Sequence, residues 1–153
     1  MKAIILAAGQ AKRLRPLANR VPKCMIIICG KPMLKWQVEL LKKYKINDIT
    51  VVTGSLGRKI KISGVSYVKN KFYRSTEQNY SIFSARNKLN GSVVISFADI
   101  IYDKKILKKI IDFKGDCGIA VRKDWKKAYR NRSLHPISEA DNVLLERDRK
   151  SVV

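Results

Sequence analysis

Short apolar runs alternate along this chain with segments whose apolar residues recur every three or four positions. The runs at 3–8, 49–53 and 92–97 contain mostly apolar or β-branched residues, which is typical of strands buried in a parallel sheet. Between the first two runs, the apolar residues of 33–44 recur at helical spacing with lysines on the opposite side. A strand, a helix and a second strand in this order are the unit of a parallel sheet.

The remaining pattern predicts further elements of both kinds. These are a strand or buried connector at 24–29, strands at 65–68 and 117–121, and helices at 75–89 and 104–113. The helix from residue 75 would open on a capping box of Ser75 and Gln78 and turn Tyr80 and Phe83 inward. In the helix from residue 104, the residues expected to form the buried stripe are Ile106, Leu107, Ile110 and Ile111.

These elements predict an α/β fold with a Rossmann-like, doubly wound, mainly parallel sheet. We expect a single domain over residues 1–145 and an irregular charged tail at 146–153. In such sheets ligands bind at the carboxyl ends of the strands. The loop at Gly9 and the carboxylate of Asp99 both follow predicted strands directly, so both are placed at that edge.

Charge changes the picture more than composition does. The chain has 153 residues and a net charge of +21, which favours polyanionic partners such as nucleotides or nucleic acid. The lysines are spread along the predicted helices, however, so a solvated basic surface explains the charge equally.

Cys24 and Cys29 lie in an apolar segment and are expected to act as small buried hydrophobes, which suits a reducing, cytoplasmic setting. The sequence shows neither a signal peptide pattern nor an apolar stretch of membrane-spanning length.

Small residues and clustered cations follow the first strand. Ala7-Ala8-Gly9 would let a ligand approach the backbone closely. Four cations follow within a short stretch: Lys12, Arg13, Arg15 and Lys23. Exposed N–H groups beside positive charge are what a polyphosphate needs. The alternative is a strand, a turn and a solvated basic loop.

Asp99 is the residue best placed to bind a metal ion. It follows Ala98 at the end of the apolar strand 92–97, and a carboxylate there can hold a divalent cation against phosphate oxygens. The alternative is an ordinary aspartate at the end of a strand. Asp103 fits the N-cap of the next helix better than a ligand role.

Several motifs of this chain resemble the nucleotidyltransferase family that activates sugar phosphates and phosphocholine. They are Leu6-Ala7-Ala8-Gly9, Arg13-Leu14, Pro16-Leu17, Pro22-Lys23 and Gly30-Lys31-Pro32. In that family the first loop wraps a nucleoside triphosphate, and the arginine and lysine contact phosphates. The resemblance assigns nucleotide binding to Leu6, Ala7, Ala8, Gly9, Ala11, Arg13 and Lys23. Ala11 stands where the family has a second glycine, and its methyl group disfavours a positive φ.

The block 72–86 is similar to the branch that contains phosphocholine and aminoalkylphosphonate cytidylyltransferases. This resemblance favours CTP as the nucleotide and makes Asn79 and Ser81 binding candidates, because an amide and a hydroxyl can recognise base or phosphate edges. The alternative for Asn79 is a polar residue in the first turn of a helix.

The segment from Trp125 to Asp141 supplies candidates for the acceptor. Some relatives carry a similar His-Pro-x-x-Glu-Ala-acid segment, so Glu139 and Asp141 are candidate substrate ligands for a cationic acceptor. His135 fits a loop residue better than a catalytic one. Trp125 and Tyr129 lie at helical spacing and fit core positions.

The resemblance implies a Mg²⁺-dependent nucleotidyl transfer from an NTP to a small phosphorylated acceptor. Arg13, Lys23 and Asp99 would be catalytic, and Asp99 would hold the metal. Family members are longer and supply a second metal-binding acid after the region matched here, so we expect a shortened member. Two alternatives remain: a nucleotide-binding remnant without turnover, and a basic nucleic-acid-binding domain, although no recognised nucleic-acid module is present.

Overall fold

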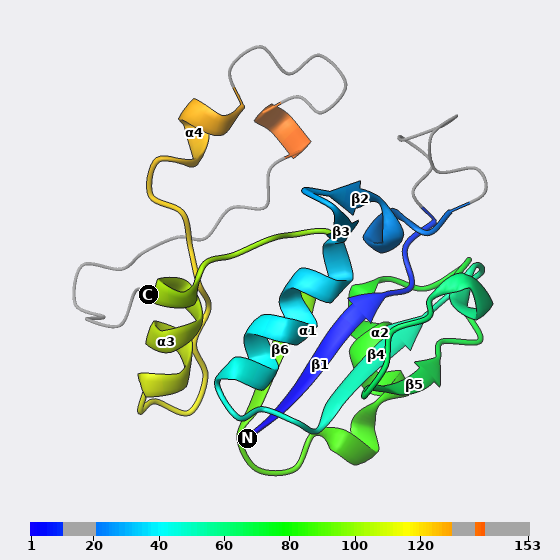
Figure 1. Cartoon of the computed structure of the whole chain (residues 1–153), viewed down its shortest axis with the longest axis horizontal. Helices are drawn as coiled ribbons and strands as arrows, with labels where there is room; N and C mark the ends of the chain where they lie inside the picture. The colour runs from blue at the N-terminus through cyan, green and yellow to red at the C-terminus, as the bar shows by residue number, and fades with distance from the viewer. Residues whose placement is uncertain (11–20, 130–136, 140–153) are drawn as a thin grey trace. The chain divides into compact units, whose positions relative to one another are not determined.

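The fold is built on a four-stranded parallel sheet. The computed structural model describes residues 1–10, 21–129 and 137–139 and divides the chain into two compact units, Met1–Asp103 and Lys104–Val153. In the first unit the strand order is β5–β4–β1–β6, and all three pairings are parallel (Figure 1). The strands are β1 (Lys2–Ala7), β4 (Ile49–Thr53), β5 (Ser66–Lys69) and β6 (Val93–Phe97).

The strand order reverses beside β1. From β1 the chain runs outward through β4 to β5 and then returns to the other side of β1 as β6. Leu6 pairs with Val52 on one side and with Phe97 on the other, so the carboxyl ends of β1 and β6 lie next to each other. This is the switch point at which open α/β sheets bind ligands. The predicted Rossmann-like parallel sheet is confirmed.

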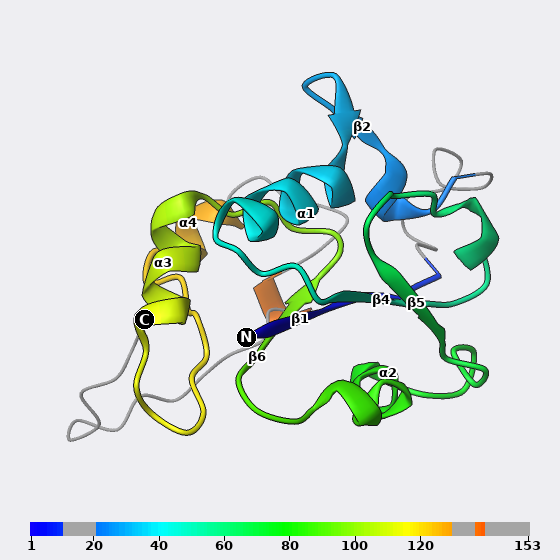
Figure 2. The ribbon, with the colours of Figure 1, turned by 60° about the horizontal axis from the view of Figure 1, so that its bottom comes forward.

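Helices cover both faces of the sheet. Figure 2 shows α1 (Met33–Lys43) on one face and α2 (Gln78–Ser84) on the other. On the α2 face Ile4, Leu6 and Val52 pack with Ala85, which follows α2. Because side chains alternate along a strand, Ile5 points to the opposite face, toward α1. Each fully buried side chain of this size contributes about 1.5–3 kcal/mol to folding.

The segment 24–29 is shorter as a strand than expected. It begins with the 3₁₀ turn η2 (Lys23–Met25) and continues as β2 (Ile27–Ile28), which pairs with β3 (Lys31–Pro32). Cys29 and Gly30 both have positive φ, 48° and 81°, as a two-residue hairpin turn requires. Cys24 is buried as predicted. Cys29 is exposed, because it lies in the turn of the β2–β3 hairpin and not against the four-stranded sheet.

The helix expected from residue 75 begins later and is broken. No side-chain cap is made at its start, and it ends at Ser84 before the 3₁₀ turn η4 (Arg86–Lys88). The Ser75 hydroxyl instead donates back to the Phe72 carbonyl oxygen at 3.4 Å. The inward orientation expected for Tyr80 and Phe83 is wrong: they are 37% and 54% exposed. They pack against each other at 6.1 Å between ring centroids.

The second unit contains α3 (Lys104–Asp112), α4 (Trp125–Ala128) and the 3₁₀ turn η5 (Ile137–Glu139). Of the expected stripe on α3, Leu107 is fully buried but Ile106 is 42% exposed. The strand expected at 117–121 is wrong: these residues form no strand, because a short apolar run becomes a strand only with a partner to pair with. A last 3₁₀ turn, η3 (Gly57–Lys59), belongs to the first unit. Among the described residues, no helix has the length and apolar character needed to cross a membrane.

Candidate active site

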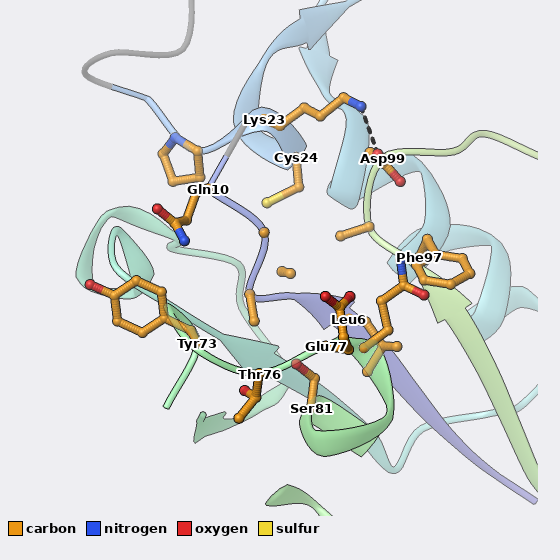
Figure 3. A pocket seen from close by; sticks show the side chains of 16 residues that line it. Leu6, Gln10, Lys23, Cys24, Tyr73, Thr76, Glu77, Ser81, Phe97 and Asp99 are labelled. Carbon is orange, nitrogen blue, oxygen red and sulfur yellow. Dashed lines mark hydrogen bonds and ion pairs between the residues drawn. The ribbon is translucent and has the colours of Figure 1, made fainter. Parts of the chain in front are cut away.

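A pocket of about 590 Å³ lies at the switch point of the first unit. Its walls come from the ends of β1 and β6, from η2, from the connection between β5 and α2, and from α2 itself (Figure 3). The lining residues are 6–10, 22–24, 73, 76–78, 81 and 97–99. The backbone of Ala98 donates to the Leu6 carbonyl oxygen at 3.0 Å, which fixes the two strand ends side by side.

Lys23 and Asp99 form an ion pair at one end of this pocket. The Lys23 Nζ lies 2.6 Å from Asp99 Oδ2, and Figure 3 shows the pair beside the loop that follows β1. Their side chains are 39% and 40% exposed. An ion pair this exposed contributes on the order of 1 kcal/mol or less, so a ligand with stronger charges can separate it.

Gly54 brings two backbones into close contact beneath the loop. A β-carbon at position 54 would lie 2.4 Å from the Ala8 carbonyl oxygen and 3.0 Å from its carbon. Only glycine therefore lets the end of β4 pass this close to the loop after β1. In the sequence Gly54 only follows the predicted strand at 49–53, and nothing in the pattern shows which backbone it touches.

Gln37 of α1 holds the turn that carries Asp99. It is 2% exposed, and its Nε2 donates to the carbonyl oxygens of Phe97 at 2.8 Å and Ile100 at 2.6 Å. Its Oε1 accepts from the Ser96 hydroxyl at 2.9 Å. The amide therefore binds backbone on both sides of Ala98 and Asp99, which fixes where the carboxylate emerges.

Cys24 lines the pocket but is not an activated nucleophile. Burial raises the pKa of its thiol to about 12, against a smaller lowering by a backbone hydrogen bond. The thiol is therefore protonated and unreactive at neutral pH. Among the described residues, no group of three or more His, Cys, Asp or Glu side chains could enclose a metal. Asp99 and Glu77 both line the pocket. The Asp99 carboxylate can share a cation with a bound phosphate, as carboxylates do at the Mg²⁺ sites of nucleotide enzymes.

The structure gathers many of the predicted site residues in one pocket. Leu6, Ala7, Ala8, Gly9, Lys23, Ser81 and Asp99 all line it. Asn79 is exposed and is not among the lining residues. Glu139 lies in η5 of the second unit. Ala11, Lys12, Arg13, Arg15, His135 and Asp141 lie outside the described residues.

Other pocket residues were missed by sequence reasoning. Gln10, Tyr73, Thr76, Glu77 and Gln78 all line it. The capping-box pattern at 75–78 drew attention to this segment but gave it a helical role. The same segment is also a polar block directly after the third strand of a predicted parallel sheet. That position is the feature that indicates a wall of a ligand-binding pocket.

A parallel sheet whose switch point carries the Gly9 backbone, Lys23 and Asp99 in one pocket has the arrangement with which open α/β proteins bind ligands. The chain belongs to the family of the MobA-like NTP transferase domain, which it matches over residues 3–146. The resemblance noted from the motifs is thereby confirmed.

Two relatives with similar sequences are cytidylyltransferases. The chain is 33% identical to the CTP:phosphoglutamine cytidylyltransferase of Campylobacter jejuni over 94% of its own length and 61% of the relative's. It is 36% identical to the choline-phosphate cytidylyltransferase of Streptococcus pneumoniae, over 67% of this chain and 46% of that one. The chain therefore spans about half to three fifths of the length of these two relatives.

Solved structures agree with the fold. The CTP:phosphocholine cytidylyltransferase from Streptococcus pneumoniae superimposes with a TM-score of 0.56 at 34% identity, over 64% of this chain and 44% of that one. The inositol-1-phosphate CTP transferase from T. maritima gives a TM-score of 0.59 at 25% identity, over 71% and 47% of the two chains.

Proposed function

We propose that this chain binds CTP and transfers its cytidylyl group to a small phosphorylated acceptor. The observation that carries the proposal is that the backbone at Gly9 and the side chains of Lys23 and Asp99 line one pocket. Membership of the NTP transferase family and the cytidylyltransferases among its relatives support the nucleotide and the reaction type. The acceptor would be a phosphorylated small molecule such as phosphocholine or a sugar phosphate.

In this reaction an oxygen of the acceptor's phosphate forms a bond to the α-phosphorus of CTP. The bond from that phosphorus to the bridging oxygen of the β-phosphate breaks, and pyrophosphate leaves with the electron pair. No covalent intermediate with the protein is needed, which agrees with the protonated Cys24 thiol. Catalysis then rests on positioning and on neutralising the charge that develops on the phosphates.

The residues of the pocket divide this work. The backbone at Ala8 and Gly9 donates N–H groups to the triphosphate, and Lys23 leaves Asp99 for a phosphate oxygen. The family's phosphate-binding arginine corresponds to Arg13, to which we assign the same role. Asp99, freed from Lys23, would hold Mg²⁺, which neutralises phosphate charge when bound. We place this chemistry in a reducing cytoplasm, in keeping with the free thiols at Cys24, Cys29 and Cys117.

Pyrophosphate release with CTP, Mg²⁺ and either phosphocholine or inositol 1-phosphate tests the proposal. We expect Lys23→Ala and Asp99→Ala each to lower turnover by about 100-fold or more, because each removes charge stabilisation at the phosphates. The matched controls are Lys31→Ala and Glu39→Ala, since Lys31 and Glu39 form an ion pair of the same 2.6 Å length outside the pocket. Their turnover should stay near that of the unmodified chain.

The same assay separates the alternatives. Full activity in Lys23→Ala or in Asp99→Ala contradicts the mechanism. Binding of CTP in calorimetry, without release of pyrophosphate from CTP in the presence of either acceptor, assigns nucleotide binding alone. UTP and GTP, run in parallel, decide whether the cytosine base is selected.

A further inference from the structure

Asn70 is a fully buried polar residue at the foot of the pocket wall. It directly follows β5, and its side chain and backbone are 0% exposed. Its backbone N–H donates to the Thr53 carbonyl oxygen at 3.0 Å, which joins the ends of β5 and β4. A buried amide costs free energy unless its hydrogen bonds are made, so its partners are informative.

The side chain of Asn70 organises the connection between β5 and α2. Its Oδ1 accepts from the Phe72 backbone N–H at 2.8 Å. Its Nδ2 donates to the Thr76 hydroxyl oxygen at 3.2 Å and to the Ser81 hydroxyl oxygen at 3.1 Å. One amide therefore ties two points of this connection to Ser81 of α2, and both segments supply a wall of the pocket.

These bonds also set the direction of two hydroxyl groups. The Thr76 hydroxyl donates its proton to the Phe72 carbonyl oxygen at 2.7 Å. The Ser81 hydroxyl accepts from Asn70, which leaves its own proton to donate elsewhere. Ser81 is 5% exposed and lines the pocket together with Thr76. Figure 3 shows the two hydroxyls together, at the opposite end of the pocket from Lys23 and Asp99.

We infer that Asn70 is a positioning residue for the nucleoside end of the bound nucleotide. It would act through Ser81, whose proton it directs toward a hydrogen-bond acceptor on the base or ribose, while Lys23 neutralises the phosphates at the other end. This inference rests on the proposed function, because it takes CTP as the occupant of the pocket. It adds a role for a residue that touches no ligand itself.

Affinity for CTP without acceptor, measured by calorimetry, tests the inference in a double-mutant cycle. We expect Asn70→Ala and Ser81→Ala each to weaken CTP binding by about 10-fold, the equivalent of one hydrogen bond. The double variant should bind about as weakly as the weaker single variant, because both changes remove the same interaction. The matched control is Ser84→Ala, which removes an exposed hydroxyl of the same helix that donates to the Tyr80 carbonyl oxygen, and it should bind CTP normally.

A positioning role and a purely structural role differ in their readouts. We expect Asn70→Ala to raise the KM for CTP while kcat at saturating CTP changes by less than about 3-fold, since chemistry occurs at the other end of the pocket. Hydrogen exchange should show lost protection at the Phe72 amide, whose acceptor is removed. Unchanged CTP affinity in Asn70→Ala, or multiplied losses in the double variant, overturns the inference.

The outcomes also separate this inference from the proposed function. If Asn70→Ala does not fold, Ser81→Ala at an unchanged melting temperature decides: lost CTP affinity supports the inference, and normal affinity overturns it. CTP binding without pyrophosphate release removes the proposed turnover and leaves the inference standing on affinities. If the unmodified chain binds no CTP, both are overturned.

Discussion

Gly54 shows how a single missing methyl group can shape a binding site. The close approach of its α-carbon to the Ala8 peptide keeps the loop after β1 tight against the end of β4. Ala8 lines the pocket, so any displacement of its peptide moves a wall that the ligand touches.

Replacing Gly54 by alanine should therefore damage both the fold and the site. We expect Gly54→Ala to lower the free energy of unfolding by about 1–3 kcal/mol, as overpacking does, and to weaken CTP binding. Gly9→Ala is the companion variant, because a β-carbon there meets nothing within 4 Å. It should keep the melting temperature and lose only affinity, by blocking close approach of the triphosphate. Urea unfolding and calorimetry measure the two effects, and normal stability in Gly54→Ala would contradict the packing argument.

Cys24 gives a second test at the scale of one residue. Burial raises the pKa of its thiol from 9.0 to about 12, and the thiolate is the form that reacts. We expect iodoacetamide at pH 8.5 to label Cys29 and Cys117, which are exposed, and to leave Cys24 unlabelled until the chain is unfolded. Peptide mass spectrometry reads each site. Rapid labelling of Cys24 in the folded chain would show that the thiol is accessible and ionised.

The same shift makes stability depend on pH in one direction. Between pH 9 and about 12 the folded chain keeps a proton on Cys24 that the unfolded chain has lost. The contribution of this thiol to stability is therefore constant below pH 9 and falls as the pH rises through that window. A Cys24→Ala variant, lacking the thiol, would show a shallower loss of stability there.

At the scale of elements, helix α1 is attached to the site as well as to the core. Its apolar residues Leu34, Val38 and Leu41 are buried, while Gln37 on the same helix binds the backbone around Asp99. One helix thus supplies hydrophobic packing along its length and a polar anchor at the pocket edge.

Removing that anchor should cost stability and activity together. We expect Gln37→Leu to lower the free energy of unfolding by about 2–4 kcal/mol, because the carbonyl groups of Phe97 and Ile100 would lose a buried donor. The control is Lys43→Leu, which adds the same side chain at an exposed position of the helix. Urea unfolding should separate the two variants. Equal stability for both would contradict an anchoring role.

Elements with a strong internal period were predictable from the sequence. The helix expected at 33–44 corresponds to α1 at Met33–Lys43, and the strand expected at 49–53 corresponds to β4 at Ile49–Thr53. The expectation failed at 75–89, where the Asn70 hydrogen bonds compete with a helical start, and at 117–121, where a strand depends on a neighbour. Periodicity reports the faces of one element, and it carries no information about contacts made with another.

The site was predictable to the same extent and for the same reason. Parallel strands end at one edge, so Gly9 and Asp99 could be placed together before their geometry was known. Lys23 was added to them by the family resemblance of the Pro22-Lys23 motif. The supporting residues Gly54, Gln37 and Asn70 act through contacts with distant segments, such as Gln37 with Phe97. Each is an ordinary residue in its local context, and only the folded chain shows its partners.

At the scale of the whole molecule, the net charge of +21 affects both binding and association. Like charge keeps copies of the chain apart. The sheet also presents partly exposed apolar residues on β6, such as Ile95 and Phe97 at 43% and 42%, and exposed strands of this kind can pair with other chains. Salt weakens the repulsion, so experiments that vary ionic strength must follow the oligomeric state as well.

The affinity for CTP should fall as salt is raised, because the phosphates bind through charge that counterions screen. We expect the slope of log affinity against log salt concentration to steepen from CMP to CDP to CTP. Cytidine, which has no phosphate, should show almost no slope and serves as the control for effects on the base. Lys23→Ala should flatten the slope for CTP, whereas Lys31→Ala, whose ion pair lies outside the pocket, should leave it unchanged.

Light scattering at each salt concentration excludes association of the chain as the cause of these slopes. Equal slopes for cytidine and CTP would mean that the charge of this chain serves its solubility alone, and steep, sequence-independent binding of oligonucleotides in the same series would favour a nucleic-acid partner.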